Sequence, residues 1–195
     1  MVYRSIIYHI IMIIISPSKN LNLRNEVFNF QRSAPFFTSE TKQIVNKVKS
    51  LDFEEIKSLM NVSESLAKLN FDRFEVFNAK NNVSKPAAFI FSGDTFNGLS
   101  IRSLNKSDLD YAQINLRILS GLYGILRPYD MIEPYRLEMG TKINKILGSS
   151  LYDFWKGKIT NKLNEDIKKS KSIFLFNLAS EEYYSVLDFR QIQCE

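Results

Sequence analysis

The sequence predicts a mixed α/β fold in a single domain, with a central, mostly buried sheet flanked by helices. Three short apolar runs, each followed by small or polar residues, have the length and composition of buried strands. Stretches with the spacing of amphipathic helices separate these runs. No repeat, low-complexity tract or linker interrupts the 195 residues, which are enough for one sizeable core. We therefore expect one domain over residues 12–195, preceded by an extension over residues 1–11.

The first strand is predicted at the end of an apolar run over residues 6–15. This run is too short for a membrane-spanning helix, which needs about 20 apolar residues. No small-x-small cleavage site follows it, so a signal peptide is not indicated either. A buried strand over residues 11–16, ended by Pro17, fits better. Translation could accordingly begin at Met12 as well as at Met1.

Two more buried strands are predicted over residues 87–91 and 172–179. Between the strands, apolar residues recur at helical spacing, and several of these stretches begin with a residue suited to an N-cap. The predicted helices cover residues 39–51, 52–62, 63–77, 108–122 and 151–167.

Polar clusters follow the three predicted strands, at residues 16–19, 92–94 and 180–182. If the strands are parallel, their carboxyl ends meet at one edge of the sheet, so the clusters would form a common cleft. We expect this cleft to be lined by Ser16, Lys19, Gly93, Asp94, Tyr135, Arg136, Asn177, Ser180 and Glu182.

An enzyme acting on a small anionic or nucleotide-like ligand is one function that such a cleft could serve. Lysine and arginine would hold the anion, and a carboxylate would act as a base. Structural ion pairs would gather the same residue types, so catalysis is not the favoured interpretation. A closed pocket lined by all four candidates would support it, and separate ion pairs would count against it. The candidate catalytic residues are Lys19, Asp94, Arg136 and Glu182.

Residues 116–140 combine glycine, proline, arginine and tyrosine in a mixture that a packing helix does not need. The sequence Gly-Leu-Tyr-Gly at 121–124 predicts a tight turn between two helices. It resembles the hairpin of a helix-hairpin-helix element, whose backbone N–H groups face a DNA phosphate. A helix C-cap accounts for the same residues about as well.

Lysine is concentrated after this segment, with eight lysines and three acidic residues between 140 and 171. This local excess equals the net charge of +5 of the whole chain, and it suits a phosphate-bearing partner. A solvated helix face would show the same composition. We expect double-stranded DNA as the partner. The residues expected to contact it are Ser120, Gly121, Leu122, Tyr123, Gly124, Arg127, Lys156, Lys158 and Lys162.

The composition argues against several other classes of site. His9 is the single histidine and Cys194 the single cysteine, so neither a disulfide framework nor a zinc site of cysteines can form. A Ser-His-Asp triad is nearly excluded, and an iron site would need oxygen ligands alone. The glycine patterns of nucleotide-binding loops are absent. We expect no cofactor and no metal, and the cysteine content suits the cytoplasm.

Five segments resemble one known family in order and spacing: ISPSKNL, FSGDTFNGL, LRILSGLYGILRPYDMIEPYRLEMGTKI, LYDFWKGKITNKLN and FNLASEEYY. Together they are similar to the bacterial YaaA peroxide-stress family over about residues 12–186. The resemblance implies a single mixed α/β domain in a cytoplasmic protein that limits damage from hydrogen peroxide and lowers free iron. It also implies DNA binding through a helix-hairpin-helix element and a positively charged cleft. That element maps onto the helix ending near Leu119, the hairpin over residues 120–124 and the helix that follows.

The chain departs from the family pattern at both ends. Residues 1–11 precede the usual start, and the family continues for some tens of residues after FNLASEEYY, adding strands and a basic segment. We therefore expect a member that lacks this C-terminal segment, with an exposed strand edge that favours aggregation. A non-functional gene product is a third interpretation. Neither a membrane nor an obligate protein partner is indicated.

Overall fold

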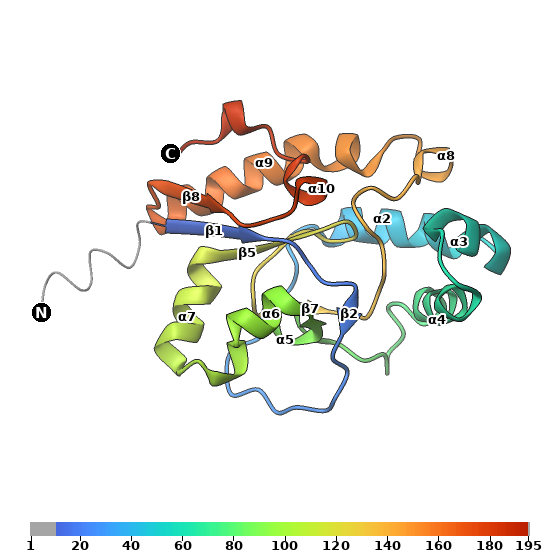
Figure 1. The fold of residues 1–195 in the computed structure, drawn as a ribbon, viewed down its shortest axis with the longest axis horizontal. Helices are drawn as coiled ribbons and strands as arrows, with labels where there is room; N and C mark the ends of the chain where they lie inside the picture. Colours follow the sequence, from blue (N-terminus) through green and yellow to red (C-terminus); the bar gives the residue numbers. More distant parts are fainter. Residues whose placement is uncertain (1–10, 195) are drawn as a thin grey trace, which may run out of the picture.

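The structure is a computed structural model that describes residues 11–194 and has a mixed α/β architecture (Figure 1). The predicted extension therefore lies outside the described residues, apart from Ile11, which begins the first strand. The strands are β1 (Ile11–Ile15), β2 (Asn20–Leu21), β3 (Lys85–Pro86), β4 (Phe91–Ser92), β5 (Leu116–Ser120), β6 (Gly124–Leu126), β7 (Met131–Ile132) and β8 (Phe174–Asn177). The α-helices are α2 (Thr38–Lys49), α3 (Phe53–Met60), α4 (Glu64–Glu75), α5 (Ala87–Ile90), α6 (Asp94–Leu99), α7 (Lys106–Asn115), α8 (Asn144–Leu147), α9 (Leu151–Ser170) and α10 (Glu181–Tyr184). Two 3-10 helices are η1 (Ile101–Ser103) and η2 (Phe189–Gln191).

The central sheet has four strands in the order β6-β5-β1-β8. Strand β1 is parallel to both of its neighbours, β5 and β8, and β6 returns antiparallel to β5. In Figure 1, α9 lies on one side of this sheet, and α7, α5 and α6 lie on the other. Two small antiparallel pairs, β2-β4 and β3-β7, lie outside the sheet. The parallel pairing brings the carboxyl ends of β1, β5 and β8 to the same edge.

One hydrophobic core joins the sheet to its helices. Met12 and Ile14 of β1, Ile118 of β5 and Trp155 of α9 are fully buried within it. The indole Nε1 of Trp155 donates a hydrogen bond to the backbone oxygen of Gly121, at 2.9 Å. This contact fixes α9 to the turn that follows β5. Within residues 11–194, no helix is long and apolar enough to cross a membrane.

The predictions for the helices before β3 and for β1 are confirmed. Asp52 caps α3 in a capping box with Glu55, and Ser63 caps α4. The β-branched run forms β1 as predicted, and its parallel partners make it an interior strand of the sheet. Local capping chemistry and a clear apolar pattern were sufficient signals for these elements.

The predicted helix over residues 108–122 was wrong in its second half. Helix α7 ends at Asn115, and the next five residues form β5, in which every residue is buried. Ile13 of β1 pairs with Leu116, the first residue of β5. Leucine, arginine and isoleucine suit a helix or a strand, and no glycine or proline separates them from α7. The pairing with β1, which is distant in sequence, decides the conformation.

Residues 120–124 form the turn of a β-hairpin between β5 and β6, so the predicted helix-hairpin-helix element is not found in this segment. Gly124 has a φ of 73°, a conformation that glycine adopts without steric cost. A Cβ on Gly121 would lie 2.4 Å from the backbone oxygen of Leu137. The two glycines are therefore explained by the turn and by close packing against the following chain.

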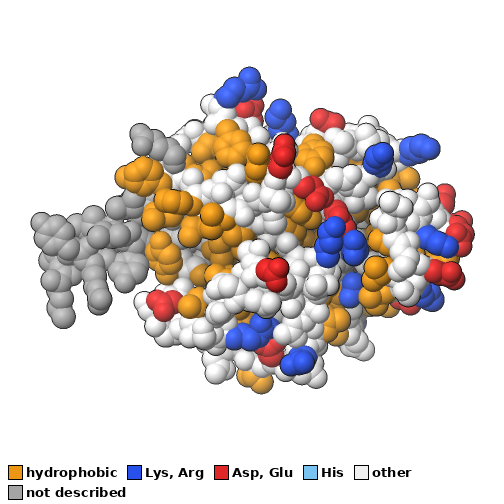
Figure 2. Space-filling model, in the orientation of Figure 1, with side chains coloured by type: hydrophobic (Ala, Val, Ile, Leu, Met, Phe, Trp, Pro, Cys, Tyr) orange, Lys and Arg blue, Asp and Glu red, His pale blue; other side chains and the backbone are white. Residues whose placement is uncertain are grey.

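The other two strand predictions need correction. Residues 87–90 form α5, a single buried helical turn, and only Phe91 and Ser92 are in a strand. A short buried apolar run does not distinguish the two conformations. Strand β8 is present, but it was predicted to be buried and is instead mostly exposed at the sheet edge, with Phe174 and Phe176 exposed by 39% and 49%. Figure 2 shows apolar side chains gathered on the side of the molecule where β8 and α7 lie.

Candidate functional site

The carboxyl ends of β1 and β8 meet, as the sequence predicts. Ser180 donates its backbone N–H to the hydroxyl of Ser16, at 2.8 Å, and the two hydroxyls lie 3.2 Å apart. The residues come from opposite ends of the chain, and the parallel pairing of Ile14 with Asn177 places them together. Two of the three predicted polar clusters therefore share one edge.

The third cluster joins them through the loop after β1. The hydroxyl of Ser18 donates a hydrogen bond to the backbone oxygen of Ser92, the last residue of β4. The next residue, Gly93, has a φ of 142°, and a Cβ there would lie 2.8 Å from the Ser18 hydroxyl. Glycine is needed at this position for both reasons. The predicted convergence is thus found, although β4 belongs to a separate small sheet.

An ion cluster of Lys19, Arg136 and Glu138 lies at this edge, and we call it the open ion cluster. Both cations bind the same carboxylate: Lys19 Nζ lies 2.8 Å from Glu138 Oε2, and Arg136 Nη2 lies 2.6 Å from Glu138 Oε1. The side chains are exposed by 57%, 19% and 24% in the order named. Figure 2 shows acidic and basic side chains side by side over the region where β1 leads into β2.

The four candidate catalytic residues do not share a single pocket with free functional groups. Lys19 and Arg136 are ion-paired, and Asp94 is exposed without a hydrogen bond or ion pair to residues 11–194. Glu182 accepts the backbone N–H of Gly140, at 3.0 Å. Of the four, Glu182 alone lines the neighbouring cavity of about 1000 Å³ between α3 and α8. This arrangement gives no geometric support to catalysis.

The remaining predicted cleft residues have structural contacts. Asn177 is exposed, and its Oδ1 accepts the backbone N–H of Ala179, at 3.0 Å. The hydroxyls of Tyr135 and Ser120 lie 2.6 Å apart in the core. Burial raises the pKa of Tyr135 far above its ordinary value, so this phenol stays protonated. Tyr135 thus supports the end of β5 from inside and does not face a ligand.

The predicted DNA-contacting hairpin is buried. All five residues from Ser120 to Gly124 are enclosed, and the side chain of Trp155 lies under 3 Å from where a Cβ on Gly124 would be. Their backbone N–H groups therefore lack a path to a DNA phosphate. The predicted lysines of α9 divide into two kinds: Lys156 is exposed, whereas Lys162 is buried. Lys158 is half-buried, and its Nζ lies 4.0 Å from the centre of the Phe154 ring.

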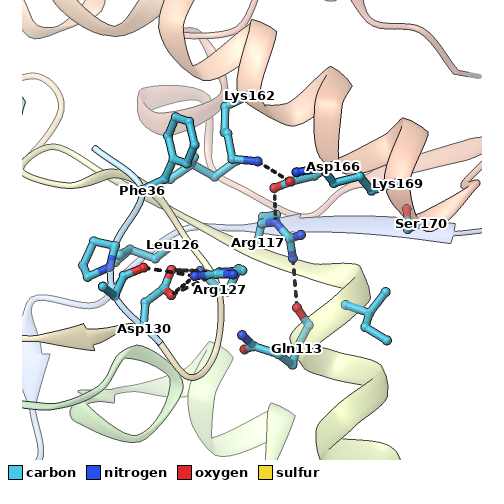
Figure 3. Close-up of a pocket in the computed structure, with 14 residues that line it drawn as sticks. Phe36, Gln113, Arg117, Leu126, Arg127, Asp130, Lys162, Asp166, Lys169 and Ser170 are labelled. Atoms are coloured by element: carbon cyan, nitrogen blue, oxygen red, sulfur yellow. Dashed lines mark hydrogen bonds and ion pairs between the residues drawn. The ribbon is translucent and has the colours of Figure 1, made fainter. Parts of the chain in front are cut away.

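Two of the predicted DNA-contacting residues, Arg127 and Lys162, line a second cavity of about 680 Å³. This cavity lies between α7, β6 and α9, and Figure 3 shows their side chains around it. Arg117 and Lys169 add two more cations, against the carboxylates of Asp130 and Asp166. The wall has four cations and two anions, so we call it the basic pocket.

The floor of the basic pocket is an ion cluster of Arg117, Asp166 and Lys162, which we call the buried ion cluster. Arg117 Nε donates to Asp166 Oδ2, at 2.7 Å, and Lys162 pairs with the other oxygen of the same carboxylate. Each side chain is exposed by less than 10%. Burial alone would raise the pKa of Asp166, but the charges of Arg117 and Lys162 lower it below its usual range.

Sequence reasoning missed Arg117, Asp166, Lys169 and Phe36 as pocket residues. A signal was present for Arg117, because a single charge inside an apolar run is almost never buried without a partner. The partner could not be identified from the sequence, since Asp166 lies on a different element and becomes a neighbour only in the fold.

Residues 11–195 match the family described as peroxide stress protein YaaA. This chain belongs to that family. The chain is 41% identical over 185 residues to a UPF0246 protein of Polynucleobacter asymbioticus, covering 94% of this chain and 72% of the relative. A UPF0246 protein of Aliivibrio fischeri is 41% identical over 188 residues with the same coverage, and one of Phenylobacterium zucineum is 42% identical over 182 residues, covering 93% and 68%. The predicted membership of the YaaA family is confirmed.

Proposed function

We propose that this YaaA family member protects against hydrogen peroxide by binding DNA through the basic pocket and the carboxyl end of α9. Membership of a peroxide stress family supports the physiological part of the proposal. The distribution of charge supports the molecular part. The proposal keeps double-stranded DNA as the partner and moves the main contact from the hairpin over residues 120–124 to α9.

The observation that carries the proposal is a group of free lysines at the end of α9. Lys168, Lys169 and Lys171 are exposed, and none forms an ion pair or hydrogen bond through its side chain within residues 11–194. Lys169 also lines the basic pocket, whose four cations exceed its two carboxylates. Free, clustered lysines can neutralise phosphates along a DNA backbone at little cost, because no internal partner has to be released.

The strand-end edge is a weaker candidate for the same role. The charges of Lys19 and Arg136 are shared with Glu138, and Glu182 lies nearby. Two carboxylates thus balance two cations, and a phosphate would have to displace an existing ion pair. The electrostatic attraction for DNA is therefore greater at α9.

Helix stability offers another explanation for part of the lysine group. Lys168 and Lys169 lie in the last turn of α9, where cations interact favourably with the helix dipole. The effect extends to Lys171, the C-cap of α9, but it does not account for the excess of cations in the basic pocket. The experiment below separates the two explanations, because a helix-dipole role alone would change stability and leave DNA binding intact.

DNA binding would also connect the chain to free iron. Cations condense on DNA phosphates, and a protein that neutralises those phosphates releases the condensed cations. Iron(II) held at the backbone gives one electron to hydrogen peroxide, which breaks into hydroxide and a hydroxyl radical while the metal becomes iron(III). Releasing iron(II) from the backbone would move radical formation away from the DNA, which limits DNA damage without itself lowering the amount of free iron.

The test is the affinity for a fluorescent duplex of mixed sequence, measured by anisotropy over a range of salt concentrations. We expect salt-dependent binding that weakens about tenfold or more when Lys168, Lys169 and Lys171 are all changed to alanine, with a smaller salt slope. The matched control changes Lys42, Lys47 and Lys80, which are exposed and unpaired on other surfaces, to alanine.

The control variant loses the same charge, so it should lose clearly less affinity if the contact is local. Equal losses in the two triple variants would show a general charge effect and overturn the assignment to α9. Duplex binding that does not respond to salt, or no binding at all, would overturn the proposal as a whole.

A further inference from the structure

We infer that the basic pocket holds one unpaired nucleotide, with its base against Phe36 and its phosphate on Lys169 and Arg117. This inference rests on the proposed DNA binding and makes it more specific. It assigns a preference for DNA that contains unpaired nucleotides, such as an overhang or a gap, over an intact duplex.

The first observation is an exposed aromatic ring at the rim of the pocket. Phe36 is 55% exposed although it lines the cavity. Its ring is held in place from two directions: it stands at 88° to the ring of Phe37, 4.9 Å away, and the Nζ of Lys162 lies 4.7 Å from its centre. A fixed and exposed aromatic ring is a platform on which a base can stack, whatever its sequence.

The second observation is the cationic wall on the side of Arg117 and Lys169. Arg117 is ion-paired with Asp166 through Nε and donates to backbone oxygens through Nη1, so a phosphate could meet only its Nη2, which makes no hydrogen bond within residues 11–194, and the pair with Asp166 would stay intact. Lys169 is exposed and unpaired beside it. In Figure 3 the side chains of Phe36, Arg117 and Lys169 surround the same cavity. An aromatic wall with cations next to it suits a base with its phosphate attached.

The size and composition of the cavity agree with this ligand class. A volume of about 680 Å³ lies within the usual range for small-molecule sites. Pro35, Ile114 and Leu126 add apolar surface, which would cover the faces of a base. In an intact duplex the bases are already stacked on one another, so Phe36 could reach only a nucleotide that is unpaired.

The experiment compares fluorescent DNA of three kinds: an intact duplex, the same duplex with a single-stranded overhang, and a single strand. We expect the wild-type chain to bind the overhang and the single strand about tenfold more tightly than the duplex. The variant Phe36→Ala should lose that preference, so that it binds the overhang, the single strand and the duplex with similar affinity. The matched control is Phe189→Ala, which removes a ring of similar exposure, 45%, from another surface.

A mononucleotide arm separates this inference from the proposed function. If the chain binds the duplex but shows no preference that depends on Phe36, the pocket assignment is overturned while DNA binding stands. If DNA does not bind but a deoxynucleoside monophosphate does, and Phe36→Ala abolishes that binding, the pocket assignment stands with a free nucleotide as its source. Failure of both ligands would overturn both proposals.

Discussion

The buried and open ion clusters have the same composition and very different surroundings. Each has one carboxylate between an arginine and a lysine, and in the buried ion cluster the lysine also lies 3.5 Å from the exposed carboxylate of Glu165. In the buried ion cluster, Asp166 and both of its cations are exposed by less than 10%. In the open ion cluster, Glu138 is exposed by 24% and Lys19 by 57%. The comparison separates the effect of burial from the effect of charge pairing.

Burial determines how much each carboxylate matters for stability. A buried charge that loses its partner cannot be stabilised by water, so removing one member of a buried pair is strongly destabilising. Water replaces an exposed partner at little cost, so surface pairs contribute little. We therefore expect the buried ion cluster to be a structural requirement for the basic pocket and the open ion cluster to be adaptable.

A third cluster, Lys85 with Glu26 and Arg102, is intermediate. The Lys85 side chain is 5% exposed, whereas Arg102 is 43% exposed. Lys85 also donates to the backbone oxygens of Asn22 and Arg24, so this one lysine holds the loop after β2. The average exposure of the two cations rises from the buried ion cluster through this third cluster to the open ion cluster, and this order can be tested with one substitution in each.

The largest effect is expected for Asp166→Asn, which leaves Arg117 buried without a counter-charge and Lys162 with only the exposed carboxylate of Glu165, 3.5 Å away. We expect a loss of about 3–5 kcal/mol in the free energy of unfolding. Urea unfolding followed by the fluorescence of Trp155, the single tryptophan and a fully buried one, measures it. The matched control is Asp72→Asn, because Lys68–Asp72 is the same pair at the same helical spacing but exposed.

Asp72→Asn should cost less than about 0.5 kcal/mol. Similar losses in the two variants would contradict the argument from burial. If Asp166→Asn proves too unstable to purify, Asp166→Glu tests the same point because it keeps the charge beside Arg117 and Lys162. Asp166→Glu should then fold and lose less stability than Asp166→Asn. An Asp166→Glu variant that is equally unstable would show that the geometry of the cluster, and not its charge, decides the loss.

An intermediate effect of about 1–3 kcal/mol at neutral pH is expected for Glu26→Gln. Arg102, through its hydrogen bonds, lowers the pKa of Glu26 from 4.5 to about 2; burial opposes this shift and Lys85 adds to it. Because the folded-state pKa is lowered, the stabilisation is present above pH 4.5 and is lost as the pH falls toward 2. Unfolding of both proteins across this range should show a difference that shrinks with acid. A difference that stays constant down to pH 2 would rule out the charge as its cause.

The sequence predicted most of the elements whose signals are local. Asp52 and Ser63 begin helices as N-caps, and the β-branched run over residues 11–15 forms a strand. It did not predict β5, because the residues from Leu116 onward suit a helix, and only the pairing with β1 makes them a strand. The burial of β8 was also mispredicted, since a strand's position at the edge of a sheet depends on the strands beside it.

The same distinction applies to the candidate sites. The strand-end edge was predicted because small and polar residues follow each apolar run, and Ser16 does meet Ser180. The basic pocket was only partly predicted, through Arg127 and Lys162. Its ion cluster requires α9 to lie across β5, and nothing near Arg117 in the sequence indicates that arrangement.

The smallest effect is expected for Glu138→Gln in the open ion cluster. The glutamine retains a carbonyl oxygen that can accept one hydrogen bond, and water can reach Lys19, so the loss should be at most about 1 kcal/mol. The matched control is Glu54→Gln, whose partner Lys57 lies 3.9 Å away on the surface. The substitution also raises the net charge at this edge. If DNA contacts α9 and not this edge, the affinity for the duplex should nevertheless change by no more than about twofold. A clear gain in DNA affinity for Glu138→Gln, absent from the Glu54→Gln control, would move the DNA contact to the strand-end edge.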